Sequence, residues 1–501
     1  MTGSNRVGAR AAGGAAVLTA GTIIYDAISA AGSVVIARLL GPADYGVLGI
    51  ALIYPMMLSG LADLGLSTAI MRYASLGDTR RALTALWLRV IAGALLAAAA
   101  ALLAPLMAAS LQRPRLAPVI CVLSAYVLAN VAATSVTAFL AGVNRFWDVV
   151  SVDVVRSAVR VASSALLIIL GHGVYGAALG FSAGYSAAAA YAFVRLARLT
   201  RVAPDLARGP VADVLGYSLP LYVPALLGIP AGQLYNMLLA VYVTDAEVGN
   251  YRVAGNLLAP LGIITGALST SLFTTLPRLA AERYKLAEAL DRAARYIALL
   301  VSPLSIALAL FSRQAVYAIY GAQYDAAPAY LAIMALSGLL APFGVLGMYL
   351  NIIGATRTTM LLNVAGMAIG LPLTWALLVR CGMLGAVSAS VIGSALNAAV
   401  SLAVVKWKYG VSLRVPRVVK YWLPSLAAGA PAYMAMHAIG GVWLAAGVGL
   451  ATYLVLLVVL TAAVTSSEDL ANLASISGGI KYAGPLISRA LNITARLKAV
   501  M

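Results

Sequence analysis

Apolar residues fill long runs of this chain, and each run ends at a short group of glycine, proline or charged residues. Such breaks include LQRPR at 111–115, GHGVYG at 171–176 and IGGV at 439–442. A helix crosses the hydrocarbon core of a bilayer in about 20 residues, and most of the runs reach that length. The pattern predicts about 14 membrane helices, over residues 15–37, 45–70, 83–110, 116–142, 149–170, 173–196, 215–243, 248–276, 293–312, 326–354, 358–379, 383–405, 421–439 and 442–464.

Composition agrees with that pattern. Hydrophobic residues make up 62% of the 501, and charged residues only 10%, whereas a soluble domain carries about 25% charged residues. The chain is therefore predicted to be an all-α polytopic membrane protein.

The net charge of +18 fits either a nucleic-acid-binding protein or a membrane protein with basic inner loops. With both termini in the cytoplasm, 28 of the 34 Lys and Arg residues lie in or beside inner segments. The other six lie outside: Arg38, Arg113, Arg115, Arg252, Arg313 and Arg380. This asymmetry predicts a multi-pass protein of the cytoplasmic membrane with both termini inside, and it removes nucleic acid as a partner.

A short internal repeat indicates how the helices are grouped. GPADYGVLGIA at 41–51 aligns without gaps to TDAEVGNYRVA at 244–254, an offset of 203 residues. Each copy has an acidic residue at the predicted outer end of a helix and a glycine two positions later. Six helices separate the copies, so both halves have the same orientation, with a pseudo-two-fold axis along the membrane normal.

The repeat predicts two six-helix lobes and an added helix pair. Residues 1–210 would form the N-lobe with helices 1–6, and residues 211–420 the C-lobe with helices 7–12. Helices 13 and 14 would occupy 421–464. Residues 465–501 would form a basic cytoplasmic tail whose amphipathic stretch lies on the inner leaflet.

Several segments together resemble the polysaccharide transporter family of Wzx-type O-antigen flippases, part of the multidrug/oligosaccharidyl-lipid/polysaccharide (MOP) exporter superfamily. They are ARLLGPADYGVLGIA (37–51), DLGLSTAIMRYAS (63–75), VGNYRVA (248–254), LPRLA (276–280), YGAQYDAAPAYLAI (320–333) and NIIGATRTT (351–359). The resemblance implies a MATE-like pair of bundles around a cavity that opens alternately to each side. It also implies a transporter of lipid-linked oligosaccharide that is not an enzyme, has no cofactor, and meets membrane lipids.

Helix one carries a polar face that fits such a cavity. Thr22, Asp26 and Ser29, with Thr19 and Ser33, fall within about 80° of one another at 100° per residue. Polar groups in a membrane helix usually face a bundle interior or water. Asp26 is a candidate site for H⁺ or Na⁺ coupling. Packing of small hydroxyls against a neighbouring helix is the alternative.

Helix five carries a second polar face with two arginines. Asp153, Arg156, Ser157, Arg160 and Ser164 lie within about 100° of one another. Guanidinium groups match phosphate oxygens bidentately, so Arg156, Arg160 and Ser164 are candidates for binding a pyrophosphate head group. Asp153 and Arg156 could equally pair with each other, or Arg156 could extend to the inner surface.

Other polar residues are candidates for substrate contact or gating. Gln233 and Asn236 follow three prolines in helix seven, where a broken helix would line a cavity. Asp63 and Arg72 lie nine residues apart near the inner end of helix two. Asp63 would be an inner-gate residue or a partner for a basic group elsewhere, and Arg72 an inner anchor.

Three functions compete on these observations. A flippase for a lipid-linked oligosaccharide fits the motifs and the arginines, and a cation-coupled exporter of small molecules fits Asp26. A membrane-embedded transferase would need a large outer loop, a carboxylate cluster or a nucleotide loop, which the sequence lacks. The arginines favour the flippase. A bundle with an internal cavity can act as a monomer.

Overall fold

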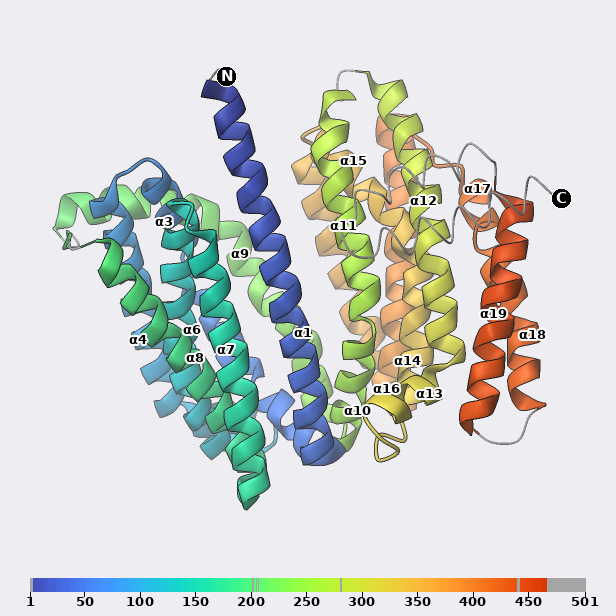
Figure 1. Ribbon diagram of the computed structural model, residues 1–501, viewed down its shortest axis with the longest axis horizontal. Coiled ribbons are helices and arrows are strands. Elements are labelled where there is room, and N and C mark those ends of the chain that lie inside the picture. Colours follow the sequence, from blue (N-terminus) through green and yellow to red (C-terminus); the bar gives the residue numbers. More distant parts are fainter. Residues whose placement is uncertain are drawn as a thin grey trace. The chain divides into compact units, whose positions relative to one another are not determined.

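The structure is a computed structural model that describes residues 3–200, 202–203, 205, 207–279, 282–438 and 442–465. Every regular element in these ranges is a helix (Figure 1), as the apolar runs predict. The predicted basic tail lies outside the described residues, apart from its first residue.

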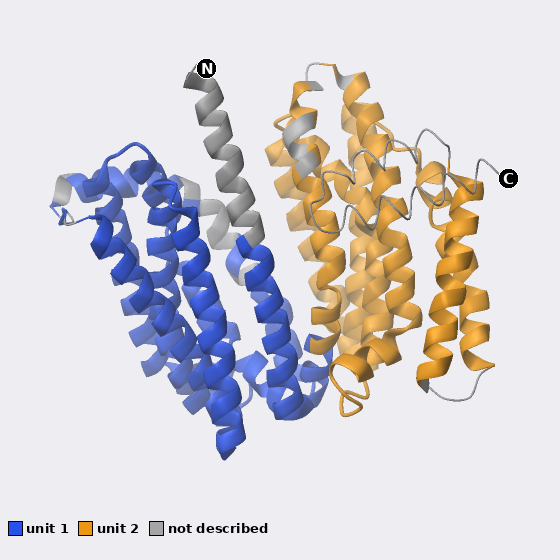
Figure 2. Ribbon diagram, viewed as in Figure 1, with its two compact units in different colours: residues 1–252 blue, residues 253–501 orange. Residues whose placement is uncertain are grey.

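The chain forms two compact units, Met1–Arg252 and Val253–Met501 (Figure 2). This division falls later in the chain than the predicted lobe boundary at residue 210. The lobes, which were predicted from the repeat rather than from compactness, stay a prediction.

The first unit contains ten α-helices, the last of which, α10, continues into the second unit. Their bounds are α1 Gly3–Ala51, α2 Ile53–Leu61, α3 Leu66–Ser75, α4 Thr79–Leu102, α5 Ala104–Ser110, α6 Ala117–Gly142, α7 Phe146–Leu167, α8 Gly173–Leu199, α9 Arg208–Tyr242 and α10 Asp245–Leu257. A 3₁₀ turn, η1 Pro114–Leu116, precedes α6, and a π-helical turn, η2 Ile168–His172, joins α7 to α8.

The second unit contains nine further α-helices in its described part. Their bounds are α11 Ala259–Thr275, α12 Arg283–Leu310, α13 Ser312–Ile319, α14 Ala327–Ala335, α15 Val345–Ile352, α16 Thr356–Tyr409, α17 Val415–Lys420, α18 Leu423–His437 and α19 Val442–Val464. Two 3₁₀ segments, η3 Leu276–Leu279 and η4 Leu336–Gly344, link α11 to α12 and α14 to α15.

The described residues include eight helical runs that are long and apolar enough to cross a membrane, or nine if one bent pair counts as a span. Three of these runs contain a glycine with non-helical backbone angles: Gly41 (φ 75°), Gly171 (φ 89°) and Gly382 (φ 59°). A positive φ is accessible to glycine at little cost, so the chain turns there. The chain is a multi-pass, all-α membrane protein, and the count of 14 spans stays a prediction.

Three predicted helices are interrupted. The run at 45–70 breaks at Leu64 and Gly65, whose φ angles are 47° and 71°. The run at 83–110 divides at Leu103 into α4 and α5, and the run at 326–354 passes through 3₁₀ turns around Pro342. Apolar length alone predicts none of these breaks, because local backbone conformation and proline create them within continuous apolar sequence.

Each unit has its own apolar core. In the first, α3, α4, α6 and α8 pack around residues such as Leu66, Leu86 and Val136. In the second, α12 packs against α14, η4 and α15, with Leu290 and Tyr349 buried between them. The helices α18 and α19 pack together and against α12, within the second unit. A separate added pair of helices stays a prediction.

Candidate functional site

Helix α7 lies between α1 and α8 at very short range, because glycines face it from both sides. A Cβ atom at Gly32 of α1 would lie 2.0 Å from a methyl of Val161, and one at Gly184 of α8 would lie 2.5 Å from the Cβ of Arg160. A side chain at Gly184 would also meet the backbone of Arg160 and force the helices apart, whereas one at Gly32 would displace the side chain of Val161. This close packing holds the backbone of Arg160 in a fixed position between two helices.

Arg160 has neutral partners. Its Nη2 donates a hydrogen bond of 2.8 Å to the Oγ of Ser29, and its guanidinium lies 4.9 Å from the ring centre of Phe181. Its Nε is buried and has no hydrogen-bond partner among the described residues. A guanidinium with an unused donor inside an apolar helix bundle is a strong site for an anion.

Arg156, one turn earlier on α7, forms an ion pair of 2.9 Å with Asp153. Its guanidinium also lies 4.8 Å and 5.3 Å from the ring centres of Tyr25 and Tyr185. The side chain of Arg156 is 14% exposed, against 31% for Asp153. This pairing is one of the two alternatives to substrate binding that the sequence allows for Arg156. The Nε of Arg156 is nevertheless buried and without a hydrogen-bond partner in the described structure.

Asp26 joins the same group of charges. It is exposed on α1, and its carboxylate is close enough to Asp153 on α7 for the two negative charges to interact. The α1–α7 cluster, as we call it, therefore consists of Asp26, Ser29, Asp153, Arg156 and Arg160. It contains two positive and two negative groups, with only Arg156 and Asp153 directly paired.

Aromatic residues around the cluster were missed by the sequence analysis. Phe181 and Tyr185 are one turn apart on α8, and Tyr185 meets Tyr126 of α6 edge to face, with ring centres 4.6 Å apart. Tyr25 adjoins Asp26 in the sequence. The sequence signal is GFSAGY at 180–185, in which each aromatic residue directly follows a glycine. Both of these glycines pack on α7.

Other predicted binding residues have different surroundings. Ser164 is buried and donates a hydrogen bond of 3.2 Å to the carbonyl of Ala177, so its hydroxyl is directed towards the α8 backbone. Thr22 is exposed on α1, one turn before Asp26. On α9, the Nδ2 of Asn236 donates to the Oε1 of Gln233 at 3.1 Å.

The two gate candidates also have defined partners. Asp63 forms an ion pair of 2.9 Å with Arg89 of α4 and accepts a hydrogen bond of 3.0 Å from Ser67. Asp63 thus has the basic partner elsewhere in the chain that its sequence position suggested. The guanidinium of Arg72 is exposed and lies 4.2 Å from the ring centre of Tyr217.

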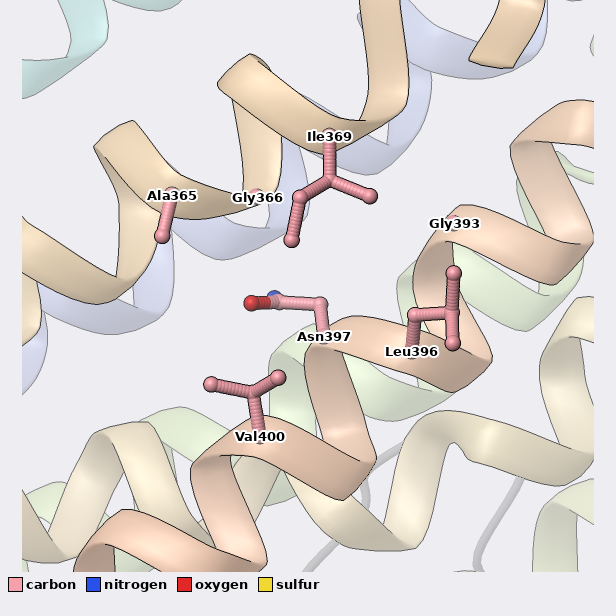
Figure 3. Close-up of a pocket in the computed structure, with 7 residues that line it drawn as sticks. All are labelled: Ala365, Gly366, Ile369, Gly393, Leu396, Asn397 and Val400. Atoms are coloured by element: carbon pink, nitrogen blue, oxygen red, sulfur yellow. The ribbon is translucent and has the colours of Figure 1, made fainter.

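The second unit has a small hollow of a different kind between the two halves of α16 (Figure 3). Asn397 and Val400 point across it towards Gly366 and Ile369 on the opposite half. Its lining contains one amide and no charged side chain. Among the described residues, no group of three or more His, Cys, Asp or Glu side chains is placed to hold a metal ion.

Solved structures with the same arrangement of helices are transporters. A lipid II flippase MurJ in an inward closed conformation matches with a TM-score of 0.72 and 14% identity, over 89% of this chain and 98% of that one. An inward-facing multidrug resistance MATE family transporter of the MOP superfamily matches with a TM-score of 0.63 and 17% identity, over 77% and 94%. A MOP superfamily transporter from Pyrococcus furiosus gives 0.52 and 18%, over 79% and 93%.

At these identities the structural matches establish the fold, which is the MATE-like fold predicted from the sequence. No curated protein matches the chain in sequence. A family model does match, over residues 35–329, and its description is polysaccharide biosynthesis protein. The matched segment covers more than half of the chain and includes the predicted motifs up to 276–280. The chain therefore belongs to the polysaccharide biosynthesis protein family and has the fold of the MOP superfamily.

Proposed function

We propose that this protein is a flippase that moves a lipid-linked oligosaccharide, a polysaccharide precursor, across the cytoplasmic membrane by alternating access. The observation that carries the proposal is the buried, unused donor on each of two arginines of α7, Arg156 and Arg160. A phosphate or pyrophosphate group that joins a sugar to a lipid is an anion that can accept from both guanidinium groups. The family and the fold of MurJ agree with such a substrate.

The surroundings of the arginines fit this substrate in two ways. The low-dielectric helix bundle strengthens attraction between a guanidinium and a phosphate relative to water. The rings of Phe181 and Tyr185 provide apolar faces beside the charge, against which a sugar ring can pack. Ser29 would keep Arg160 oriented until the phosphate arrives. The protein would act as a non-enzymatic transporter, with both termini in the cytoplasm and a monomer as the working unit.

A second function, cation-coupled export of small molecules, is favoured by Asp26. This carboxylate is exposed on α1, and its negative charge interacts with that of Asp153, so a bound cation would reduce the repulsion between the two charges. The same pair could couple a flippase to an ion gradient. Carboxylates alone would suit a cationic drug, whereas Arg160 opposes one.

Translocation of a fluorescent lipid-linked oligosaccharide in proteoliposomes distinguishes the two functions. Arg160→Ala should abolish most of the transport, while Arg313→Ala, which removes an arginine beside Tyr317 in the second unit, should leave it intact. Asp26→Asn should alter only the dependence of transport on an ion gradient. Wild-type protein that ignores the lipid but moves cationic dyes, in a manner lost in Asp26→Asn, would establish the exporter instead.

A further inference from the structure

Basic residues gather in the second unit where α16 ends and the chain leads through α17 towards α18. Between positions 406 and 420 the chain has five lysine and arginine residues and no acidic residue. All five side chains are exposed: Lys406, Lys408, Arg414, Arg417 and Lys420. Residues 406–420 are called the basic junction here.

The basic junction is fixed to the second unit by its apolar residues. Leu413 and Val418 are buried in the core of that unit, and α17 packs against α12. The backbone N–H of Arg414 donates a hydrogen bond of 3.0 Å to Oδ1 of Asp291 on α12. The basic side chains of α17 and of the residue before it recur every three positions, so they share one face of the helix, away from the buried valine. The fold therefore holds this basic face in place and leaves it open.

The positive charges of the basic junction lack counter-charges. Among the residues that the structure describes, none of its five basic side chains forms an ion pair, whereas Lys285, Arg292 and Arg295 of α12 each pair with a carboxylate. The nearby carboxylate of Asp291 is already engaged, by Arg295 and by the backbone of Arg414. Like charges held on one surface repel one another, so an anion from outside the chain would stabilise this arrangement.

A tryptophan indicates the depth at which the basic junction lies. Trp407 stands between Lys406 and Lys408 and is 88% exposed. Tryptophan is enriched at the head-group level of membranes, because its ring is apolar and its N–H is polar. Nζ of Lys408 donates a hydrogen bond of 3.3 Å to Thr358 at the start of α16, which keeps this charge at the helix ends. The charges therefore lie at the level of the lipid phosphates.

We propose that the basic junction binds the head groups of anionic phospholipids at the membrane surface. The proposal is independent of the proposed function, because this binding needs no transported substrate. Each Lys or Arg beside a membrane surface raises the affinity for anionic lipid about fivefold. A zwitterionic head group carries its own ammonium group, which the basic face repels. Bound anionic lipid would hold α17 in the head-group layer and fix the point at which α16 leaves the membrane.

Quenching of Trp407 fluorescence by brominated lipid tests the proposal. The whole chain would be placed in nanodiscs of phosphatidylcholine with phosphatidylglycerol as the minor lipid, and the signal of Trp407 obtained by difference from Trp407→Phe. Bromine on the acyl chains of phosphatidylglycerol should quench Trp407 at least about twofold more strongly than the same amount of bromine on phosphatidylcholine.

Paired variants assign this preference to the basic junction. Arg417→Gln/Lys420→Gln should lower the relative affinity for phosphatidylglycerol by about 25-fold and remove most of the preference. Lys285→Gln/Arg292→Gln is the matched control, because it removes the same charge from exposed side chains of α12 that already have acidic partners. The control should keep the preference, and so should Arg417→Lys/Lys420→Arg, which keeps both charges.

Three results would overturn the proposal. Equal quenching by the two lipids in the wild type would show that the basic junction does not select anionic lipid. An equal loss of preference in the two glutamine variants would show that only the net charge of the chain matters. Loss of the preference on addition of inorganic phosphate, at an ionic strength matched with chloride, would mean that the basic junction binds a soluble anion. None of these results depends on whether the protein moves a lipid-linked oligosaccharide.

Discussion

The two units share a helical architecture but differ in where they keep charge. In the first, Asp26, Asp153, Arg156 and Arg160 lie well inside apolar runs, and Arg89 lies deep in α4. In the second, residues 296–312, 326–356 and 358–379 contain no Asp, Glu, Lys or Arg, and neither do residues 381–405. Accordingly, the hollow between the two halves of α16 is lined by one amide and no charged side chain.

This difference indicates where chemistry is to be expected. Charge inside a membrane helix is costly and persists where it has a partner or a task. Arg89 has a partner in Asp63, whereas Arg160 has a neutral hydroxyl and a ring. The first unit thus contains both a structural charge pair and a binding candidate, and the second unit is expected to contribute packing.

The largest expected effect is on stability, from Asp63→Ala. The side chain of Arg89 is only 9% exposed, and loss of its carboxylate partner leaves a buried charge uncompensated, at a cost of about 3–5 kcal/mol. Thermal unfolding in detergent should show a large drop in Tm. Asp325→Ala, at an exposed site of the second unit, should change little. Recovery of the Tm in the double variant Asp63→Ala/Arg89→Leu would show that the unpaired charge is the cause of the loss. The same Tm in Asp63→Ala as in Asp325→Ala would contradict the expectation.

Affinity for the head group should change next most, in Arg160→Ala. Loss of one charge-assisted hydrogen-bonding group costs about 1.5–3 kcal/mol, so a Kd for a soluble pyrophosphoryl-oligosaccharide should rise about 100-fold. Arg160→Lys should recover part of that loss, because it keeps the charge without the planar fork. Isothermal titration checks both variants. An unchanged Kd in Arg160→Ala would remove the α1–α7 cluster from the binding site.

A smaller effect of opposite sign is expected from Asp153→Asn. The ion pair between Asp153 and Arg156 competes with an incoming phosphate, so its removal should tighten binding of the same ligand by about three- to tenfold, or roughly 1 kcal/mol. Asp44→Asn, at an exposed corner, serves as the control. Weaker binding in Asp153→Asn would mean that this carboxylate orients Arg156 for the ligand rather than competing with it.

The smallest effect should come from the hollow of the second unit. Asn397→Leu replaces one amide in an otherwise apolar lining, and we expect stability to change by about 0.5 kcal/mol or less, with ligand affinity unchanged. Thermal unfolding and titration check this expectation together. A tenfold loss of affinity in this variant would show that the second unit also contacts the ligand.

Sequence reasoning predicted the helical fold correctly, because the fold depends on periodicity and residue type. The binding role of the two arginines and the lobes drawn from the weak repeat stay predictions. Sequence reasoning did not predict the break at Leu64 and Gly65. The backbone conformation there turns an apolar run and places Asp63 within ion-pair distance of Arg89. It also missed Phe181 and Tyr185, since aromatic residues in an apolar helix resemble ordinary core until their neighbours are known. Contacts between distant segments cannot be obtained from local patterns.

Direct localisation of the ligand tests the central claim that the anionic head group binds in the first unit. Benzoylphenylalanine would be introduced at Phe181, beside Arg160, and separately at Ile369 in the hollow of α16. Irradiation with radiolabelled lipid-linked oligosaccharide should label the protein at position 181, and excess unlabelled ligand should suppress that labelling. Specific labelling at position 369 with none at 181 would contradict the assignment of the binding site to the α1–α7 cluster.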